Sequence, residues 1–161
     1  MTLQAIHGDA FALLAQQEVT AFAHGVNIFG RMGAGVADVV AKRWPDVFAA
    51  YENACKGPDG QCNGKGALQG GKILPVKTFD TETNKYILVY NLASQDYPGK
   101  HGRLEWVDET ARKMVAHAEA KGITHISIVR IGCGIAGLSW SDVEPLLQAI
   151  ETPVTLLAAY L

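Results

Sequence analysis

The sequence predicts an α/β fold in which helices cover a mixed β-sheet. Short apolar, β-branched runs alternate along the 161 residues with segments of helical periodicity, which is the order expected of such a fold. Two glycine-rich turns, Gly30–Gly35 and Gly132–Gly137, each stand where an apolar strand ends and a helix is expected to begin. The chain contains no internal repeat, low-complexity tract or linker. We therefore expect one domain over residues 1–161.

Periodicity predicts the elements of the first half: a strand at 2–7, a short helical segment at 11–16, a strand at 19–26, and helices at 35–44 and 47–55. The first strand ends at Gly8 and Asp9. The second is expected to be buried, because nearly all of its residues are apolar. Pro45 is expected to end the helix that begins at Gly35.

The second half follows a loop, expected at 56–71 because this segment holds six glycines and little apolar content. Periodicity then predicts strands at 72–79 and 86–93, a helix at 104–121, and, beyond it, a strand at 126–129, a helix at 141–150 and a strand at 154–161. The long helix is the clearest, because its apolar residues form one stripe and Gly122 ends it. Ser141 and Glu144 match a capping box, which predicts that the next helix begins there.

Composition excludes several classes of protein. A net charge of -2 argues against a general nucleic-acid binder, which needs a basic surface to neutralise phosphates. The sequence shows no secretion signal and no apolar run near the roughly 20 residues of a membrane-spanning helix. The three cysteines, Cys55, Cys62 and Cys133, are an odd number, typical of reduced intracellular thiols, and too few for a structural zinc site. We expect a cytoplasmic monomer without a metal or cofactor.

The two glycine-rich turns indicate a ligand with phosphate groups. Glycine lets backbone amides approach a ligand and face it without obstruction by a side chain. A helix that begins just after the turn adds partial positive charge at its N-terminus. Two such turns in one small α/β domain predict a cleft for a phosphorylated ligand with two ends, such as a nucleotide.

Five short segments together resemble the macrodomain family, whose ligand is ADP-ribose. They are Gly8-Asp9, Ala23–Asn27, Arg31–Ala37, Arg130–Gly134 and Leu138–Trp140. The resemblance extends over essentially the whole chain. It is greatest to the branch with the terminal ADP-ribose protein glycohydrolase and the DNA-ADP-ribosyl glycohydrolase antitoxins. It implies a macrodomain-type three-layer sandwich, with a mixed sheet of about six strands and helices on both faces.

The resemblance also implies a place for each part of ADP-ribose. Asp9 would accept a hydrogen bond from the adenine amino group, beside the backbone of Ala10; aspartate is also a preferred helix cap, and both roles can hold. The turn 132–137 would wrap the diphosphate, and the turn 31–35 would lie beside the distal ribose. The expected ligand-binding residues are Asp9, Ala10, Asn27, Arg31, Met32, Gly33, Ala34, Gly35, Ser94, Gln95, Gly132, Cys133, Gly134, Ile135, Ala136, Gly137 and, closing the adenine side, Tyr160 and Leu161.

The sequence departs from the glycohydrolase branch at two catalytic positions. The catalytic lysine of that branch falls at or near Gln95, and its catalytic aspartate falls at Ala136. Glutamine and alanine can neither form a Schiff base nor act as a general base. If the protein is an enzyme, we expect water to attack the anomeric carbon or the 1″-phosphate. Lys100, five residues beyond Gln95, is the one displaced lysine that could restore a covalent route.

Four polar residues are the candidates for catalysis: Asp96, Asn27, His24 and His101. Asp96 lies in the loop 94–102, and we expect it to activate the water, with His24 or His101 in reserve. Asn27 would orient the hydroxyls of the distal ribose. Each has a structural alternative: solvated loop polarity for Asp96 and His101, a hydrogen-bonded core residue for His24, and turn formation for Asn27.

Three functions stay open at this stage. The first is hydrolysis of an ADP-ribose derivative, either an ADP-ribosyl group on a protein or nucleic acid, or ADP-ribose 1″-phosphate. The second is a non-catalytic reader of ADP-ribose, which Gln95 and Ala136 favour. The third is a module that sequesters a free nucleotide. An enzyme needs an acid or base within about 3 Å, or one water, of the bond that breaks, whereas a reader needs only shape.

Overall fold

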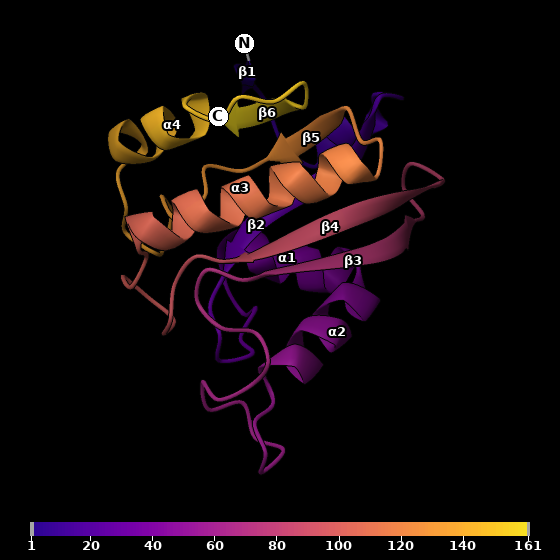
Figure 1. Ribbon diagram of the computed structural model, residues 1–161. Helices are drawn as coiled ribbons and strands as arrows, with labels where there is room; N and C mark the ends of the chain where they lie inside the picture. Colours follow the sequence, from indigo (N-terminus) through magenta and orange to yellow (C-terminus); the bar gives the residue numbers. More distant parts are fainter. Residues whose placement is uncertain (1, 161) are drawn as a thin grey trace.

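The computed structural model describes residues 2–160, and its centre is a mixed six-stranded sheet (Figure 1). The strands are β1 (Leu3–His7), β2 (Val19–Val26), β3 (Ile73–Asp80), β4 (Lys85–Ala93), β5 (His125–Ile128) and β6 (Thr155–Tyr160). Their order across the sheet is β1-β6-β5-β2-β4-β3. β3 is antiparallel to β4, and the other neighbours are parallel. The predicted α/β fold with about six mixed strands is confirmed.

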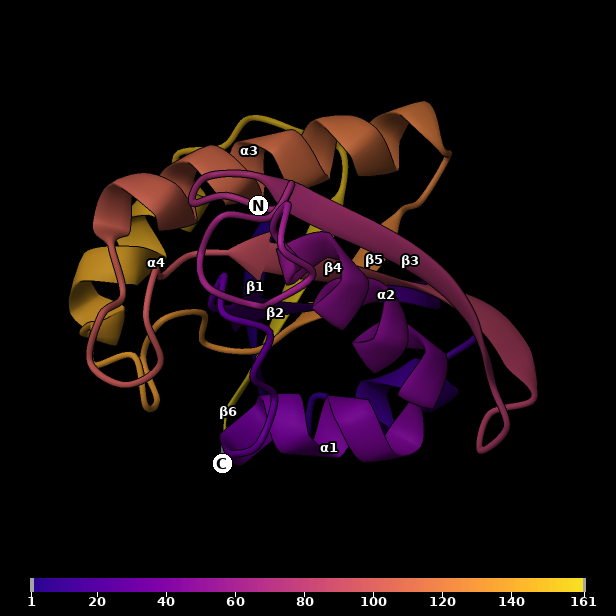
Figure 2. The same cartoon turned by 90° about the horizontal axis from the view of Figure 1, so that it is seen from below.

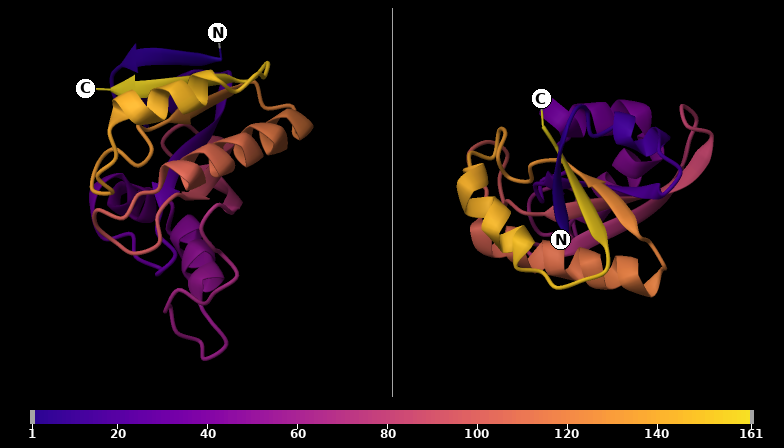
Figure 3. Two further views of the ribbon diagram at one scale, coloured as in Figure 1. Left: turned by 60° about the vertical axis from the view of Figure 1, so that its left-hand side comes forward. Right: turned by 90° about the horizontal axis from the view of Figure 1, so that it is seen from above.

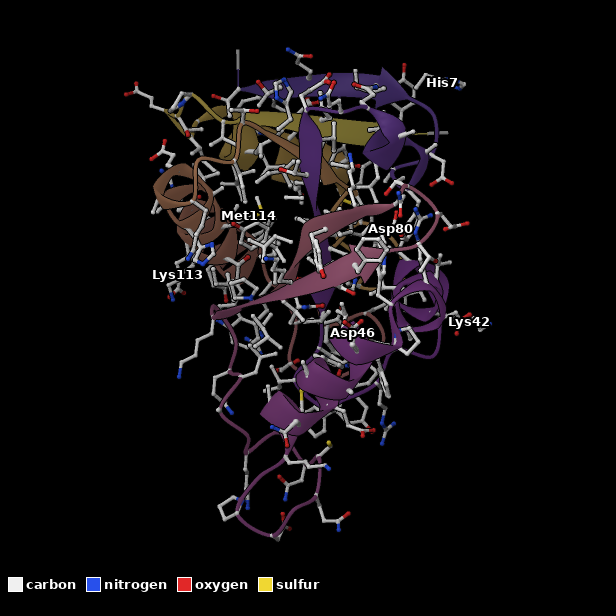
Figure 4. All side chains as sticks on the ribbon, turned by 90° about the vertical axis from the view of Figure 1, so that its right-hand side faces the viewer. His7, Lys42, Asp46, Asp80, Lys113 and Met114 are labelled. Carbon is white, nitrogen blue, oxygen red and sulfur yellow. The ribbon has the colours of Figure 1, made fainter. Side chains whose placement is uncertain are left out.

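Helices cover both faces of the sheet, as expected (Figures 2 and 3). They are the 3-10 helix η1 (Ala12–Ala15) and the α-helices α1 (Gly35–Arg43), α2 (Pro45–Cys55), α3 (Leu104–Ala120) and α4 (Trp140–Gln148). η1, α1 and α2 pack on one face, and α3 and α4 on the other. In Figure 4, Met114 points from α3 toward the sheet, whereas Lys113 lies on the exposed side of the helix, where its amine donates to the carbonyl of Gly71. This alternation explains the apolar stripe in the sequence of α3.

The carboxyl ends of five strands meet along one edge of the sheet, because β1, β6, β5, β2 and β4 are parallel. From one side to the other, this edge carries Gly8 after β1, Tyr160 at the end of β6, Arg130 after β5, Asn27 after β2 and Ser94 after β4. Open α/β sheets bind their ligands at this edge. The topology therefore brings both glycine-rich turns to the same place.

The starts of two α-helices, α2 and α4, differ from the sequence-based prediction. The capping box was wrong, because α4 begins at Trp140 with Ser139 as its N-cap, and the Ser139 hydroxyl pairs with that of Ser141 at 2.7 Å instead of a backbone amide. Pro45 ends α1, as predicted, but it also occupies the first turn of α2. Proline suits that position because its missing N–H has no partner there anyway. Within residues 2–160, no helix is both long enough and apolar enough to span a membrane.

One buried carboxylate joins the helices on the first face to the β3–β4 hairpin. Asp80, 1% exposed, accepts two hydrogen bonds from Arg43, at 2.9 and 3.0 Å, and one from the Trp44 indole at 3.0 Å. The backbone amide and hydroxyl of Thr83 complete its partners. Burial alone raises the pKa of Asp80, but the hydrogen bonds from Arg43, Thr83 and Trp44 outweigh it and lower the pKa to about 2.

Candidate functional site

A cavity of about 880 Å³ lies at the carboxyl edge of the sheet. Its walls come from both glycine-rich turns, from the residues that follow β1, β2 and β5, and from the end of β6. This volume lies in the range typical of sites for nucleotides and other small ligands. All of the expected ligand-binding residues within 2–160 line it, except Met32, Ser94 and Gly137. Leu161 lies outside the described residues.

The three exceptions have different causes. Met32 is 4% exposed and packs into the core on the α1 face. Ser94 is completely buried, so it lies beneath the cavity surface. Gly137 turns its α-carbon toward Lys100, whose side chain would meet a Cβ there at 3.2 Å. These corrections follow from packing, which residue type and spacing do not reveal.

The first glycine-rich turn is held by Asn27. Its amide nitrogen donates to the carbonyl of Arg31 at 2.9 Å, and its amide oxygen accepts from the backbone N–H of Phe29 at 2.9 Å. The Tyr51 hydroxyl lies 2.7 Å from that amide oxygen and accepts from the Arg31 amide at 3.2 Å. The side chain of Asn27 therefore shapes the turn. Asn27 also lines the cavity, so its expected role in orienting ribose hydroxyls stays a prediction beside turn formation.

The second glycine-rich turn is closed by its own backbone. The Leu138 amide donates to the carbonyl of Gly132 at 2.7 Å, and the Gly137 amide donates to that of Gly134 at 3.1 Å. Gly132 has a φ of 76°, in the left-handed region that favours glycine. Burial raises the pKa of the Cys133 thiol, an effect that the nearby Arg130 charge only partly opposes. Cys133 is therefore a neutral thiol in the cavity wall.

Asp9 marks the β1 end of the cavity. Its Oδ1 accepts a hydrogen bond from the backbone N–H of Phe11 at 3.0 Å, which caps the start of the short helical segment. Oδ2 is the oxygen that can accept a bond from a ligand, because Asp9 lines the cavity and is exposed. The geometry thus permits both of the roles expected for this residue.

The loop 94–102 connects the two glycine-rich turns. The Ile28 amide donates to the carbonyl of Asp96 at 3.2 Å, and the Gly102 amide donates to that of Ala136 at 3.1 Å. The rings of Phe29 and Tyr97 meet edge to face at 4.9 Å between their centroids. The loop is therefore bonded to Ile28, two residues before the first turn, and to Ala136 within the second turn.

The side chain of Asp96 does not line this cavity. It accepts a hydrogen bond from the guanidinium of Arg103 at 2.6 Å and another from the Tyr97 amide at 2.7 Å. The bond from Arg103 holds the pKa of Asp96 below its usual range, so the carboxylate is ionised and paired with that guanidinium. His101 and Lys100 also lie outside the lining, whereas Gln95 belongs to it. Asp96 and His101 therefore lie outside the cavity lining, and their expected catalytic roles stay predictions.

His24 lies at the floor of the cavity and is 1% exposed. It is on β2, directly opposite Asn91 on β4, and its Nε2 lies 2.7 Å from the Asn91 amide oxygen. Asn91 donates its amide nitrogen to the carbonyl of Leu74, so its oxygen faces the imidazole and accepts the Nε2 proton. This places the imidazole lone pair on Nδ1, a buried atom with no partner among residues 2–160. Burial lowers the pKa of His24 to about 4, although the bond to Asn91 opposes this effect.

The buried histidine predicts a specific pH dependence of stability. The free energy of unfolding should decrease as the pH falls from 6.5 toward 4, because unfolded His24 gains a proton in this range and folded His24 does not. One such proton contributes a slope of about 1.4 kcal/mol per pH unit. Urea unfolding at pH 7 and pH 5 measures it, and the variant His24→Gln should lack this part of the slope. The same pH dependence in both proteins would contradict the prediction.

The comparison with known families identifies the fold. The sequence model of the Macro domain matches residues 23–147, most of the chain. This chain belongs to the macrodomain family. The expected three-layer sandwich agrees with the macrodomain neighbours among solved structures, such as Thermosipho africanus DarTG in complex with ADP-ribose. That structure has a TM-score of 0.78 and 25% identity, covering 99% of this chain and 42% of the other.

Two curated relatives carry different activities in their names. A DNA ADP-ribosyl glycohydrolase of Mycobacterium tuberculosis is 28% identical over 131 residues, which cover 81% of this macrodomain and 34% of that protein. An ADP-ribose 1″-phosphate phosphatase of Candida albicans is 26% identical over 159 residues, covering 92% and 94% of the two chains. The macrodomain spans between a third and two fifths of the length of the first four curated relatives.

Sequence reasoning did not single out two residues of this macrodomain site. Asn91 fixes the proton of His24, and the available signal was a polar residue at the centre of a buried strand. Arg130 lines the cavity beside Trp140 and Tyr160, and it was noted only as part of a motif. Both depend on the pairing of distant segments, which one sequence does not reveal.

Proposed function

We propose that this macrodomain binds ADP-ribose and hydrolyses an ADP-ribose derivative. The substrate is an ADP-ribosyl group on a protein or nucleic acid, or ADP-ribose 1″-phosphate. The observation that carries the proposal is the cavity lined by both glycine-rich turns, with Asp9 at one end and His24 at its floor. The names of the glycohydrolase and phosphatase relatives and the ADP-ribose complex of the structural neighbour support the same ligand.

In this proposal the ligand lies along the carboxyl edge of the sheet. Asp9 and the backbone of Ala10 face the adenine, and Tyr160 closes that side. The turn 132–137 surrounds the diphosphate with backbone amides, and the turn 31–35 lies beside the distal ribose. Backbone donors suit phosphate oxygens because they are fixed in place before the ligand arrives.

We assign the proton chemistry to His24. Water attacks the anomeric carbon or the 1″-phosphorus, and the bond to the leaving group breaks. Nδ1 of His24 receives the proton of the water and passes it to the leaving group, which restores the neutral imidazole. Asn91 holds the imidazole in the tautomer that leaves Nδ1 free. No lysine lines the cavity among the described residues, so the proposal contains no covalent sugar–lysine adduct. Borohydride should therefore trap no adduct during turnover.

A reader without catalysis is the second candidate, and the cavity-lining Gln95 and Ala136 favour it. Release of ADP-ribose from ADP-ribosylated protein and DNA, and of inorganic phosphate from ADP-ribose 1″-phosphate, separates the two. Product from any of these substrates over a day supports the hydrolase. Complete absence of product from all of them, with ADP-ribose still bound, establishes a reader or a module that sequesters the nucleotide.

Binding itself gives a direct prediction. Calorimetry should detect ADP-ribose at micromolar or tighter affinity, about -8 kcal/mol. Asp9→Ala should weaken binding by about 1–3 kcal/mol, because a buried adenine donor loses its acceptor. If ADP-ribose produces no heat in calorimetry and no thermal shift, the proposed function is refuted. Unchanged affinity of Asp9→Ala would reduce Asp9 to a helix cap.

Composition also suggests the domain organisation, the oligomeric state and the compartment of the protein. We propose that residues 1–161 act as a single macrodomain and a monomer in the cytoplasm, without general affinity for nucleic acids. The slightly negative net charge and the three free cysteines support this setting. Gel filtration with light scattering measures the oligomeric state.

A further inference from the structure

Arg130 is an exposed cation held in place at the cavity wall. Its guanidinium lies over the ring of Trp140, at 5.0 Å from the centroid, and over the ring of Tyr160, at 5.3 Å. All three side chains line the cavity. Among residues 2–160, no carboxylate forms an ion pair with Arg130. The charge is therefore positioned by aromatic faces and is available to a ligand.

Both rings are themselves anchored. The indole N–H of Trp140 donates to Glu144 at 3.0 Å within α4, and the ring of Tyr160 contacts His7 edge to face at 5.4 Å between centroids. Rings fixed in this way restrict the guanidinium, which lowers the entropy lost when it binds a ligand. A guanidinium stacked on aromatic rings leaves the N–H donors at the edge of its plane free. Two of these donors can bind two oxygens of one phosphate.

The topology places this charge in the middle of the ligand path. β5, which Arg130 follows, lies between β6 and β2, so Arg130 falls between Tyr160 on the Asp9 side and Asn27 on the other side. Arg130 also lies two residues before Gly132, the start of the turn 132–137, and its charge acts on Cys133 within that turn. A ligand that extends from Asp9 to the first glycine-rich turn must pass this position.

The geometry points to Arg130 as a residue that reads the diphosphate of the bound nucleotide and selects for it over unphosphorylated adenosine. The backbone amides of the turn 132–137 surround the diphosphate. This turn has no charged residue of its own, and Arg130 supplies a full positive charge beside it. This inference rests on the proposed function, because it assumes that a nucleotide diphosphate occupies the cavity. It adds a side chain that discriminates between ligands by charge.

The test compares Arg130→Gln with the unaltered protein, using adenosine, ADP and ADP-ribose as probes. Calorimetry should show affinity for ADP and ADP-ribose falling about 10-fold or more, since hydrogen bonds to charged groups are the strong ones. Adenosine binding, followed by ligand-observed NMR, should change less than twofold. Added salt should weaken ADP-ribose binding less in the variant, because one charge contact is missing. Arg112→Gln is the matched control, since Arg112 is an exposed arginine on α3 and lies outside the cavity.

Two further results complete the test. Arg130→Lys should recover only part of the affinity, because lysine keeps the charge but not the planar, stacked donors. Equal ADP-ribose affinity in Arg130→Gln and the unaltered protein would overturn the inference. So would an equal loss for adenosine and ADP-ribose, which would show that Arg130 only supports the shape of the cavity. Failure of the unaltered protein to bind ADP-ribose is a different result, because it refutes the proposed function itself.

Discussion

Replacing His24 by alanine is expected to lower the rate of product release about 100-fold or more. The reason is that Nδ1 of His24 is a buried acceptor without a partner among the described residues, at the floor of the cavity, and is held in one tautomer by Asn91. ADP-ribose affinity should change much less, because the proposed adenine and diphosphate contacts lie elsewhere in the cavity. Turnover under saturating substrate, together with calorimetry, separates the two effects.

Two other variants make this prediction specific. Asn91→Leu removes the acceptor that fixes the imidazole proton, so it should lower kcat while leaving KM nearly unchanged. Asp96→Ala should leave kcat within a few-fold, because Asp96 is bonded to Arg103 and does not line the cavity. A 100-fold loss in Asp96→Ala, with normal turnover in His24→Ala, would return the catalytic role to the loop 94–102.

Asp80→Ala is expected to lower the free energy of unfolding by about 3 kcal/mol or more. Removing this buried carboxylate leaves the indole N–H of Trp44 without its acceptor, and it leaves the guanidinium of Arg43, only 16% exposed, with Glu82 as its remaining ion-pair partner. Urea unfolding at pH 7 measures the change. Asp38→Ala is a suitable control because Asp38 pairs with an exposed lysine one turn away, and it should change stability by only a few tenths of a kcal/mol.

The same carboxylate predicts the acid end of the stability profile. The folded pKa of Asp80 is about 2 and its ordinary value is 3.8. A carboxylate whose pKa is lower in the folded state stabilises the fold at pH values above its ordinary pKa. This contribution is lost as the pH falls from about 4 toward 2. The unaltered protein should therefore lose more stability than Asp80→Asn over this interval. Parallel curves for the two proteins would show that Asp80 does not set the acid limit.

The fold was largely predictable because its signals are local. The apolar stripe of α3 and the nearly continuous apolar run of β2 are each visible within the sequence of a single element, and both are buried as expected. The capping box failed for a related reason. Ser141 has the right neighbours in sequence, but the N-cap of α4 is Ser139, two residues earlier, directly after the second glycine-rich turn and Leu138.

The sequence predicted the parts of the site that are formed by backbone atoms better than the parts that are formed by side chains. Glycine at positions 33, 35, 132 and 134 identifies two turns without knowledge of their partners, and both turns line the cavity. Side chains were harder to place. Asp96 has the chemistry of a base, but its carboxylate is paired with Arg103, seven residues later. The proposed role of His24 depends on a hydrogen bond to Asn91, 67 residues away in the sequence and on the neighbouring strand. Residue type gives the chemistry that is possible, and long-range pairing decides which side chain can perform it.

The position of β1 has a consequence for the order in which the protein folds. β1 has β6 as its neighbour in the sheet, and their register joins Leu3 to Leu156. During synthesis on the ribosome, β1 therefore cannot pair with β6 until nearly the whole chain has been made. Such distant contacts slow folding relative to a helical domain of similar size. The Asp9 side of the cavity should consequently be the last part to form, and nascent chains stopped before β6 should not retain ADP-ribose.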